Sequence, residues 1–93
     1  MKNMIIDTGD RFVINHCGVE SFLAYRLSGE VLDLYNAFVP ELMKGKGFAS
    51  ELILYGIHYA AMKGYRIKPS HPAVIRFLKV NKEWQYLSVF GLN

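Results

Sequence analysis

The chain has 93 residues, of which 52% are hydrophobic, 14% aromatic and 20% charged. These proportions exclude a disordered chain and predict one globular domain over residues 1–93, with room for one site. The net charge of +3 comes from basic residues spread along the chain, which suits an anionic small ligand. Cys17 is the only cysteine, so an internal disulfide and a multi-cysteine metal site are excluded.

The apolar segments of the chain are all short. None approaches the about 20 residues that a membrane-spanning helix needs. The N-terminal segment reaches Asp7 too early for a signal peptide. We therefore expect a cytoplasmic protein with no membrane partner.

The N-terminal part of the chain, up to Pro40, predicts short strands in an antiparallel meander. The expected strands cover residues 4–7, 11–15, 22–27 and 31–39. Turn-forming residues separate them at 8–10, around Cys17-Gly18 and at Ser28-Gly29-Glu30. Pro40 ends the last strand because it has no amide hydrogen to donate to a ladder.

A helical period follows from Phe48 to Lys63, with Gly64 as its C-terminal cap. The expected buried face carries Leu52, Tyr55, Tyr59 and Met62, joined on one side by Ile53, Ile57 and Ala60. Gly56 lies in the middle of this helix, where glycine is about 1 kcal/mol less favourable than alanine. We expect it to permit close packing against the sheet.

The C-terminal third predicts another strand and a second, shorter helix. Residues 65–68 are expected to pair parallel to residues 31–39, which makes residues 31–68 a β-α-β unit. Ser70-His71-Pro72 then supplies cap-type residues and a proline that a first helical turn accepts. The apolar stripe of the second helix is formed by Val74, Ile75, Phe77 and Leu78. The aromatic tail at residues 84–87 is expected to pack back on the domain.

The segment Lys44-Gly45-Lys46-Gly47-Phe48-Ala49 lies between a strand end and a helix start. Its glycines let the backbone approach a ligand, and the first amides of the helix have no partner within it. The helix dipole and the two lysines add positive charge, which is typical of a phosphate site. A short glycine pattern is also compatible with an ordinary solvated turn, and the segment lacks both the P-loop and the GxGxxG signatures.

This segment resembles the signature of the GCN5-related N-acetyltransferases (GNAT superfamily), which is Arg or Gln, two residues, Gly, one residue, then Gly or Ala. Here Lys44 replaces the usual Arg or Gln. The chain is most similar to the very small single-domain subgroup, whose members read approximately Asp-Leu-x-His-Thr-x-Val-Pro before the loop and Pro-Ser-Cys before a short helix. The corresponding residues are Asp33-Leu34-Tyr35-Asn36-Ala37-Phe38-Val39-Pro40, Pro69-Ser70-His71 and the tail Trp84-Gln85-Tyr86-Leu87.

The resemblance implies an α+β GNAT-like fold, the acyl-CoA N-acyltransferase fold. It has N-terminal antiparallel strands, a β-α-β unit and a short C-terminal helix. It also implies acetyl-coenzyme A as co-substrate, with the pyrophosphate on the glycine segment and the pantetheine arm beside the strand that ends at Val39. The implied cofactor-binding residues are Phe38, Val39, Lys44, Gly45, Lys46, Gly47, Phe48, Ala49, Ser50 and Arg76. Two polar positions typical of the subgroup differ, because its histidine is Asn36 here and its cysteine is His71.

Acetyl transfer needs a neutral amine, a donor for the developing oxyanion and a proton for the departing thiolate. His71 is our candidate general base, because the N-terminus of a helix favours a neutral imidazole. The alternative is that His71 caps that helix together with Ser70. Asn36 is either a hydrogen-bonding group beside the thioester or a structural strand residue. Tyr35 and Tyr55 could protonate a thiolate, but aromatic packing explains both more simply.

Other polar residues are given weaker roles. Arg76 and Lys79 either reach the adenosine phosphate of the cofactor or form an ordinary solvated face. His16 and His58 are expected at the surface, and no metal site is predicted from their spacing.

Three functions follow from these patterns. The first is an N-acetyltransferase that uses acetyl-coenzyme A and acts on an amine of a small molecule or protein, as a monomer or homodimer. The second is a coenzyme A or acyl-coenzyme A binding module without catalysis, which the changes at Asn36 and His71 favour. The third is a basic nucleic-acid-binding domain. We expect no nucleic-acid partner, because the sequence does not interleave basic and aromatic residues as an RNA-binding sheet does.

Overall fold

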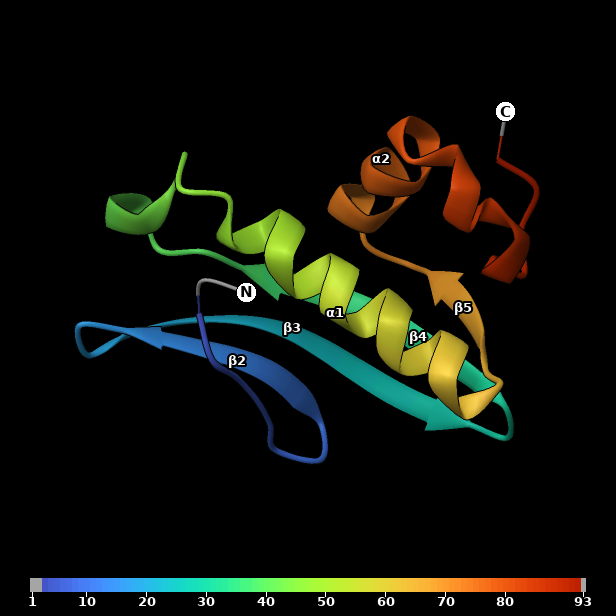
Figure 1. Cartoon of the computed structure of the whole chain (residues 1–93), viewed down its shortest axis with the longest axis horizontal. Coiled ribbons are helices and arrows are strands. Elements are labelled where there is room, and N and C mark those ends of the chain that lie inside the picture. The colour runs from blue at the N-terminus through green and yellow to red at the C-terminus, as the bar shows by residue number, and fades with distance from the viewer. Residues whose placement is uncertain (1–2, 93) are drawn as a thin grey trace.

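The computed structural model describes residues 3–92, which form one mixed five-stranded sheet with helices (Figure 1). Its strands are β1 (Ile5–Asp7), β2 (Arg11–His16), β3 (Val19–Ser28), β4 (Val31–Phe38) and β5 (Arg66–Pro69). The order in the sheet is the order in the chain, with β1 to β4 antiparallel and β5 parallel to β4. The predicted α+β class, the meander and the parallel pair are confirmed.

Two helices and two shorter 3₁₀ helices complete the fold: η1 (Glu41–Met43), α1 (Phe48–Lys63), α2 (Pro72–Val80) and η2 (Lys82–Leu87). The helix α1 begins and ends where the sequence predicts, with the left-handed Gly64 as its C-cap. It carries the chain from β4 to β5, which makes the parallel pairing of these two strands sterically feasible.

Strand boundaries differ slightly from the sequence-based expectation. The strand β3 begins at Val19 instead of residue 22, because Cys17 (φ 54°) and Gly18 (φ 79°) turn the chain tightly enough for His16 to pair with Val19. The strand β5 is shifted by one residue and includes Pro69, which lies opposite Leu34 at the last paired position. A proline is tolerated there because the ladder stops.

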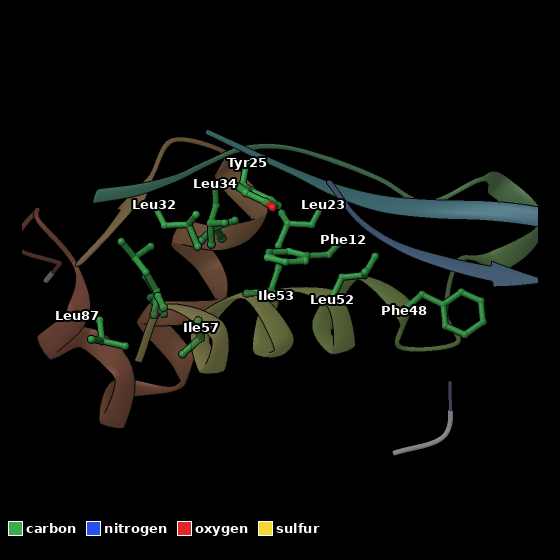
Figure 2. Close-up of a cluster of buried hydrophobic side chains, with 14 of the residues drawn as sticks. Phe12, Leu23, Tyr25, Leu32, Leu34, Phe48, Leu52, Ile53, Ile57 and Leu87 are labelled. Atoms are coloured by element: carbon green, nitrogen blue, oxygen red, sulfur yellow. The ribbon is translucent and has the colours of Figure 1, made fainter. Parts of the chain in front are cut away.

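The hydrophobic core lies between the sheet and the helices. Figure 2 shows side chains from the strands and from α1 pointing toward one another across this space. The strands contribute Phe12, Ile14, Leu23, Tyr25, Leu32, Leu34 and Ile67, and the helical segments contribute Phe48, Leu52, Ile53, Ile57, Ala60, Val74, Leu78 and Leu87. Because α1 and α2 both add residues to this cluster, they cover the same face of the sheet.

The prediction for the buried face of α1 is partly wrong. Its fully buried residues are Phe48, Leu52, Ile53, Gly56, Ile57 and Ala60, whereas Tyr55 and Tyr59 are half-buried. Met62, which was expected in the core, is 88% exposed. The helix is rotated so that the small residues Gly56 and Ala60 face the sheet, which brings the backbone close and turns the 55–59–62 stripe toward solvent.

Tyr25 links β3 to the short edge strand. Its ring stacks on Phe12 with centroids 4.5 Å apart, and its hydroxyl donates a 2.6 Å hydrogen bond to Asp7. Burial raises the pKa of the Tyr25 hydroxyl, and the hydrogen bond to the Asp7 carboxylate acts in the same direction. This tyrosine therefore stays a neutral donor that ties β1 to the core.

The C-terminal tail packs back on the sheet, as predicted. Leu87 is buried, and the amide of Val89 donates to the carbonyl of Ile67 in β5 at 2.8 Å. The guanidinium of Arg66 donates to the carbonyls of Leu87 and Ser88, which fixes the tail along β5. Within residues 3–92, no helix combines the length and apolar character needed to cross a bilayer.

Gly56 packs as closely as expected and yields a stability prediction. A Cβ atom placed there would lie 3.2 Å from Leu23 Cδ2 and 3.4 Å from Phe12 Cε2. We expect Gly56→Leu to lower the free energy of unfolding by about 1–3 kcal/mol, because the added methylenes overpack the core. Urea denaturation measures this loss. The control Ala61→Leu, at an exposed position of the same helix, should leave the midpoint within about 0.5 kcal/mol of the parent.

Candidate functional site

Residues 44–49, called the glycine loop below, follow η1 and include the first two residues of α1. Gly45 (φ 81°) and Gly47 (φ 82°) both adopt the left-handed conformation, and Gly47 is the N-cap of α1. A Cβ added at either glycine would meet nothing within 4 Å. Glycine is needed here for its backbone conformation, which a side chain would strain.

The amides of this loop point to no acceptor within the described chain. The Lys44 amide donates to the Glu41 carbonyl at 3.3 Å, and the next amide with a partner is that of Glu51, which donates to the Gly47 carbonyl at 3.0 Å. Between them, the backbone amides of residues 45–50 donate to no acceptor among residues 3–92, and no side chain caps the helix at Gly47. These N–H groups stand at the positive end of the α1 dipole, so the loop has the donors and the field that an anion requires.

Two adjoining pockets lie against this helix end. One of about 290 Å³ is lined by every residue of the glycine loop except Lys46, together with Val39, Met43 and Ser50. The other, of about 570 Å³, lies between α1 and α2. Ala49 and Ser50 line both, so the two pockets meet at the first turn of α1.

The structure separates the cationic side chains that the sequence placed near the cofactor. Arg76 lines the larger pocket, whereas Lys79 is exposed on α2 and lines neither of the two pockets. Lys44 Nζ lies 3.3 Å from a carboxylate oxygen of Glu41, so its charge is partly offset, and Lys46 makes no ion pair with a described residue. Of the glycine-loop residues, Lys46 does not line the smaller pocket.

The strand β4 loses its β5 partner close to the site but stays paired with β3. It pairs with β5 only from Val31 to Leu34, and the Leu34 carbonyl then accepts from the amides of Ser70 and His71, at 3.2 Å each. Its register with β3 shifts between Ala24 and Tyr25, which makes Tyr35 the extra residue of a β-bulge. Beyond this bulge, residues 35–38 have no strand pairing on the β5 side within the described chain, so an extended ligand has an open edge to lie along.

His71 is the N-cap of α2. Its Nδ1 accepts a hydrogen bond from the amide of Ala73 at 3.1 Å, with Pro72 in the first helical position. An imidazole nitrogen that accepts carries no proton, so Nε2 bears the hydrogen and acts as a donor. The capping alternative is therefore confirmed for His71, and a general-base role would require that this bond be broken.

Ser70 does not share the cap, contrary to that alternative. Its hydroxyl donates to Asp33 on β4 at 2.6 Å, and the other Asp33 oxygen lies 3.8 Å from the guanidinium of Arg26. That guanidinium stacks over the Tyr35 ring, 4.0 Å from its centroid. The sequence analysis missed this Ser70–Asp33–Arg26 chain. The chain of contacts follows from the parallel register, which pairs Asp33 with Lys68, two residues before Ser70. Only a prediction of that register would have indicated it.

The remaining candidates lie in different surroundings. Asn36 is exposed on β4 beside the bulge, and its side chain makes no hydrogen bond within residues 3–92. Tyr55 packs edge-on against Phe12, so the packing interpretation holds for it. His58 is exposed beside Trp84, but His16 is half-buried with its ring 5.4 Å from that of Phe48. No cluster of three or more potential metal ligands occurs among the described residues.

A sequence model described as GCN5-related N-acetyl-transferase matches residues 11–87, which is well over half of the chain. The chain belongs to the GCN5-related N-acetyltransferase family. This match includes the whole β-α-β unit, the glycine loop and the cap of α2.

The cap at His71 gives a prediction that does not depend on activity. Replacing His71 with alanine removes the acceptor for the Ala73 amide and should lower the free energy of unfolding by about 0.5–2 kcal/mol. His71→Asp keeps a capping oxygen near the helix N-terminus and should retain parental stability. Chemical denaturation of the two variants measures the difference. An alanine variant as stable as the parent chain would show that the Nδ1 bond contributes nothing.

Proposed function

We propose that this chain binds coenzyme A at the glycine loop and transfers an acetyl group from acetyl-coenzyme A to an amine. The observation that carries the proposal is the run of amides at residues 45–50 without acceptors in the described chain. They surround a pocket at the N-terminus of a 16-residue helix. A diphosphate supplies several acceptor oxygens and negative charge in one compact group, which matches this arrangement.

The surrounding residues fit the other parts of the cofactor. We assign the pyrophosphate to the loop amides that line the smaller pocket, with Lys46 of the same loop as an additional positive charge outside that lining, and Arg76 in the adjoining pocket suits the additional phosphate of the adenosine. Residues 35–38 offer backbone donors and acceptors along an open strand edge, and Val39 lines the neighbouring pocket. The amide groups of a pantetheine arm are able to pair with such an edge as a strand does.

The reaction forms a bond between the acceptor nitrogen and the acetyl carbon and breaks the carbon–sulfur bond of the thioester. The nitrogen loses a proton and the departing thiolate gains one. Two side chains near the end of the β4–β5 pairing are available to this chemistry. Asn36 presents a free amide beside the bulge, and His71 presents Nε2–H.

In this arrangement His71 serves as a donor to developing negative charge, on the carbonyl oxygen or the sulfur, while its other nitrogen holds the helix. The base that takes the proton of the amine is then water or another basic group of the acceptor molecule. Our proposal thus changes the role of His71 from general base to hydrogen-bond donor.

A second function is a binding module that holds coenzyme A or an acyl-coenzyme A without turnover. The engagement of His71 Nδ1 in the α2 cap favours it, because this nitrogen is the one that would have to accept a proton. The two functions share the glycine loop and differ only in whether thiol is released.

Binding is tested by the effect of coenzyme A on thermal stability. A ligand at about 100 times its Kd stabilises the folded state by about 2.7 kcal/mol, which raises the Tm by several degrees. We expect this rise with the parent chain and its loss with Gly47→Val, because a β-branched residue strains the left-handed N-cap and shifts the loop amides out of position. Gly29→Val is the matched control, since Gly29 (φ 61°) also has a positive φ but lies in the β3–β4 turn.

Both variants are compared with their own Tm in buffer alone, which separates loss of binding from loss of stability. If Gly47→Val and Gly29→Val respond to coenzyme A alike, the glycine loop is not the binding site.

Turnover is tested by release of free thiol from acetyl-coenzyme A with a panel of amine acceptors. Once an acceptor is found, His71→Asp should reduce kcat by roughly 100-fold, because it keeps the cap but removes the Nε2–H donor. Coenzyme A should still raise the Tm of this variant. Thiol release that is unchanged in His71→Asp would remove His71 from the mechanism, and a parent chain that binds coenzyme A but releases no thiol would be the binding module.

A further inference from the structure

One face of the sheet is left uncovered by the described helices. Because α1 and α2 share a core with the inward side chains of the strands, the alternate side chains point away from both helices. On this outer face, the register brings four apolar side chains into one line across four strands. Ile6 pairs with Val13, Val13 with Phe22, and Phe22 with Phe38. We call these four residues the outer row.

The ends of the outer row are open to solvent. Ile6 is 54% exposed and Phe38 is 50% exposed, while Met4, which immediately precedes β1, is 80% exposed. An antiparallel sheet with one solvated face normally carries polar residues there. Val13 is only 6% exposed, so the accessible apolar surface of the outer row lies at Ile6, Phe22 and Phe38, and exposed apolar side chains on a solvated sheet face are typical of an interface.

The Arg11 side chain covers part of the outer row. The guanidinium of Arg11 lies over the Phe22 ring, 4.9 Å from its centroid, and Phe22 lies 5.8 Å from Phe38 between ring centroids. Arg11 thus covers the Phe22 ring, whereas Ile6 and Phe38 at the two ends of the outer row remain exposed to solvent. Its nearest described acid is Asp10, at 3.9 Å and largely exposed, which is a weak pairing.

Charges of opposite sign flank the outer row. Arg11 precedes Val13 by two residues in β2, and Glu20 precedes Phe22 by two residues in β3. Because β2 and β3 are antiparallel, Arg11 and Glu20 fall on opposite sides of the row, where Arg11 pairs with Ala24 and Glu20 with Asn15. Next to its apolar line, the outer face therefore carries Arg11 on one side and Glu20 on the other.

This pattern is complementary to itself. A two-fold axis along the outer row would place two such faces together, with each apolar residue opposite its own copy. The same rotation would carry Arg11 of one chain over Asn15 of the other, next to Glu20 in the neighbouring strand. Two sheets packed face to face lie about 10 Å apart, which two long charged side chains can span.

We propose that the outer face is the interface of a homodimer, in which the outer rows of two copies pack together and Arg11 of each copy pairs with Glu20 of the other. A second copy fits better than a different partner, because the face provides both members of the ion pair in the arrangement that an isologous contact requires. Nothing in this proposal depends on coenzyme A or on catalysis.

Sedimentation of the full chain over a range of micromolar concentrations tests the proposal. We expect the mass of a dimer for the parent chain and of a monomer for Phe38→Asp, which places a charge in the apolar line. Phe90→Asp is the matched control and should remain dimeric, since Phe90 is similarly exposed, at 48%, in the C-terminal tail. Circular dichroism of each variant establishes that a monomer is folded.

Charge reversal tests the geometry. Arg11→Glu and Glu20→Arg should each weaken the dimer by roughly tenfold or more, and the double variant should regain most of the parental affinity. A parent chain that stays monomeric, a dimer that survives Phe38→Asp, or a double variant no better than the single ones would each overturn the proposal. A monomer that instead co-sediments with an oligonucleotide or with anionic vesicles would assign the face to that partner and overturn it as well.

Discussion

The carbonyl oxygen of Leu34 accepts hydrogen bonds from two successive amides, those of Ser70 and His71, and the rest of the site depends on this contact. It ends the parallel pairing of β4 and β5 after four residue pairs. The chain that leaves β5 must then turn into α2, so His71 falls at the helix N-terminus. The part of β4 beyond Leu34 keeps an open edge that leads to Val39 and the glycine loop. The Leu34 carbonyl thus marks the point where β4 and β5 separate, and the His71 cap, the bulge at Tyr35 and the pocket at the glycine loop lie around the gap between these strands.

The features that were predicted correctly are those set by local chemistry. Gly47 and Gly64 mark the ends of α1 because only glycine adopts their left-handed conformation without strain, and Pro72 marks the start of α2. The alternation of the strands and the pairing order follow from short turns between neighbours. Such signals lie within a few residues of the feature they specify, so they can be read before the chain is folded.

The features that were missed depend on residues far apart in the sequence. Met62 has the right spacing for a core residue, but the rotation of α1 is decided by how closely Gly56 approaches Leu23 and Phe12. The hydrogen bond from Ser70 to Asp33 spans 37 positions and requires the parallel register. For His71, the sequence indicated both a cap and a base, and only the position of the Ala73 amide shows which nitrogen is engaged.

The C-terminal tail has a consequence for the behaviour of the sheet in concentrated solution. A parallel strand at the margin of a sheet exposes N–H and C=O groups that can recruit strands from other molecules and start aggregation. Here Val89 and the Arg66 contacts occupy that margin of β5. The opposite margin is β1, which is only three residues long and offers little length for recruitment. The tail therefore protects this edge against ordered self-association in the hydrogen-bonding direction of the sheet, and this small domain achieves it without an additional strand.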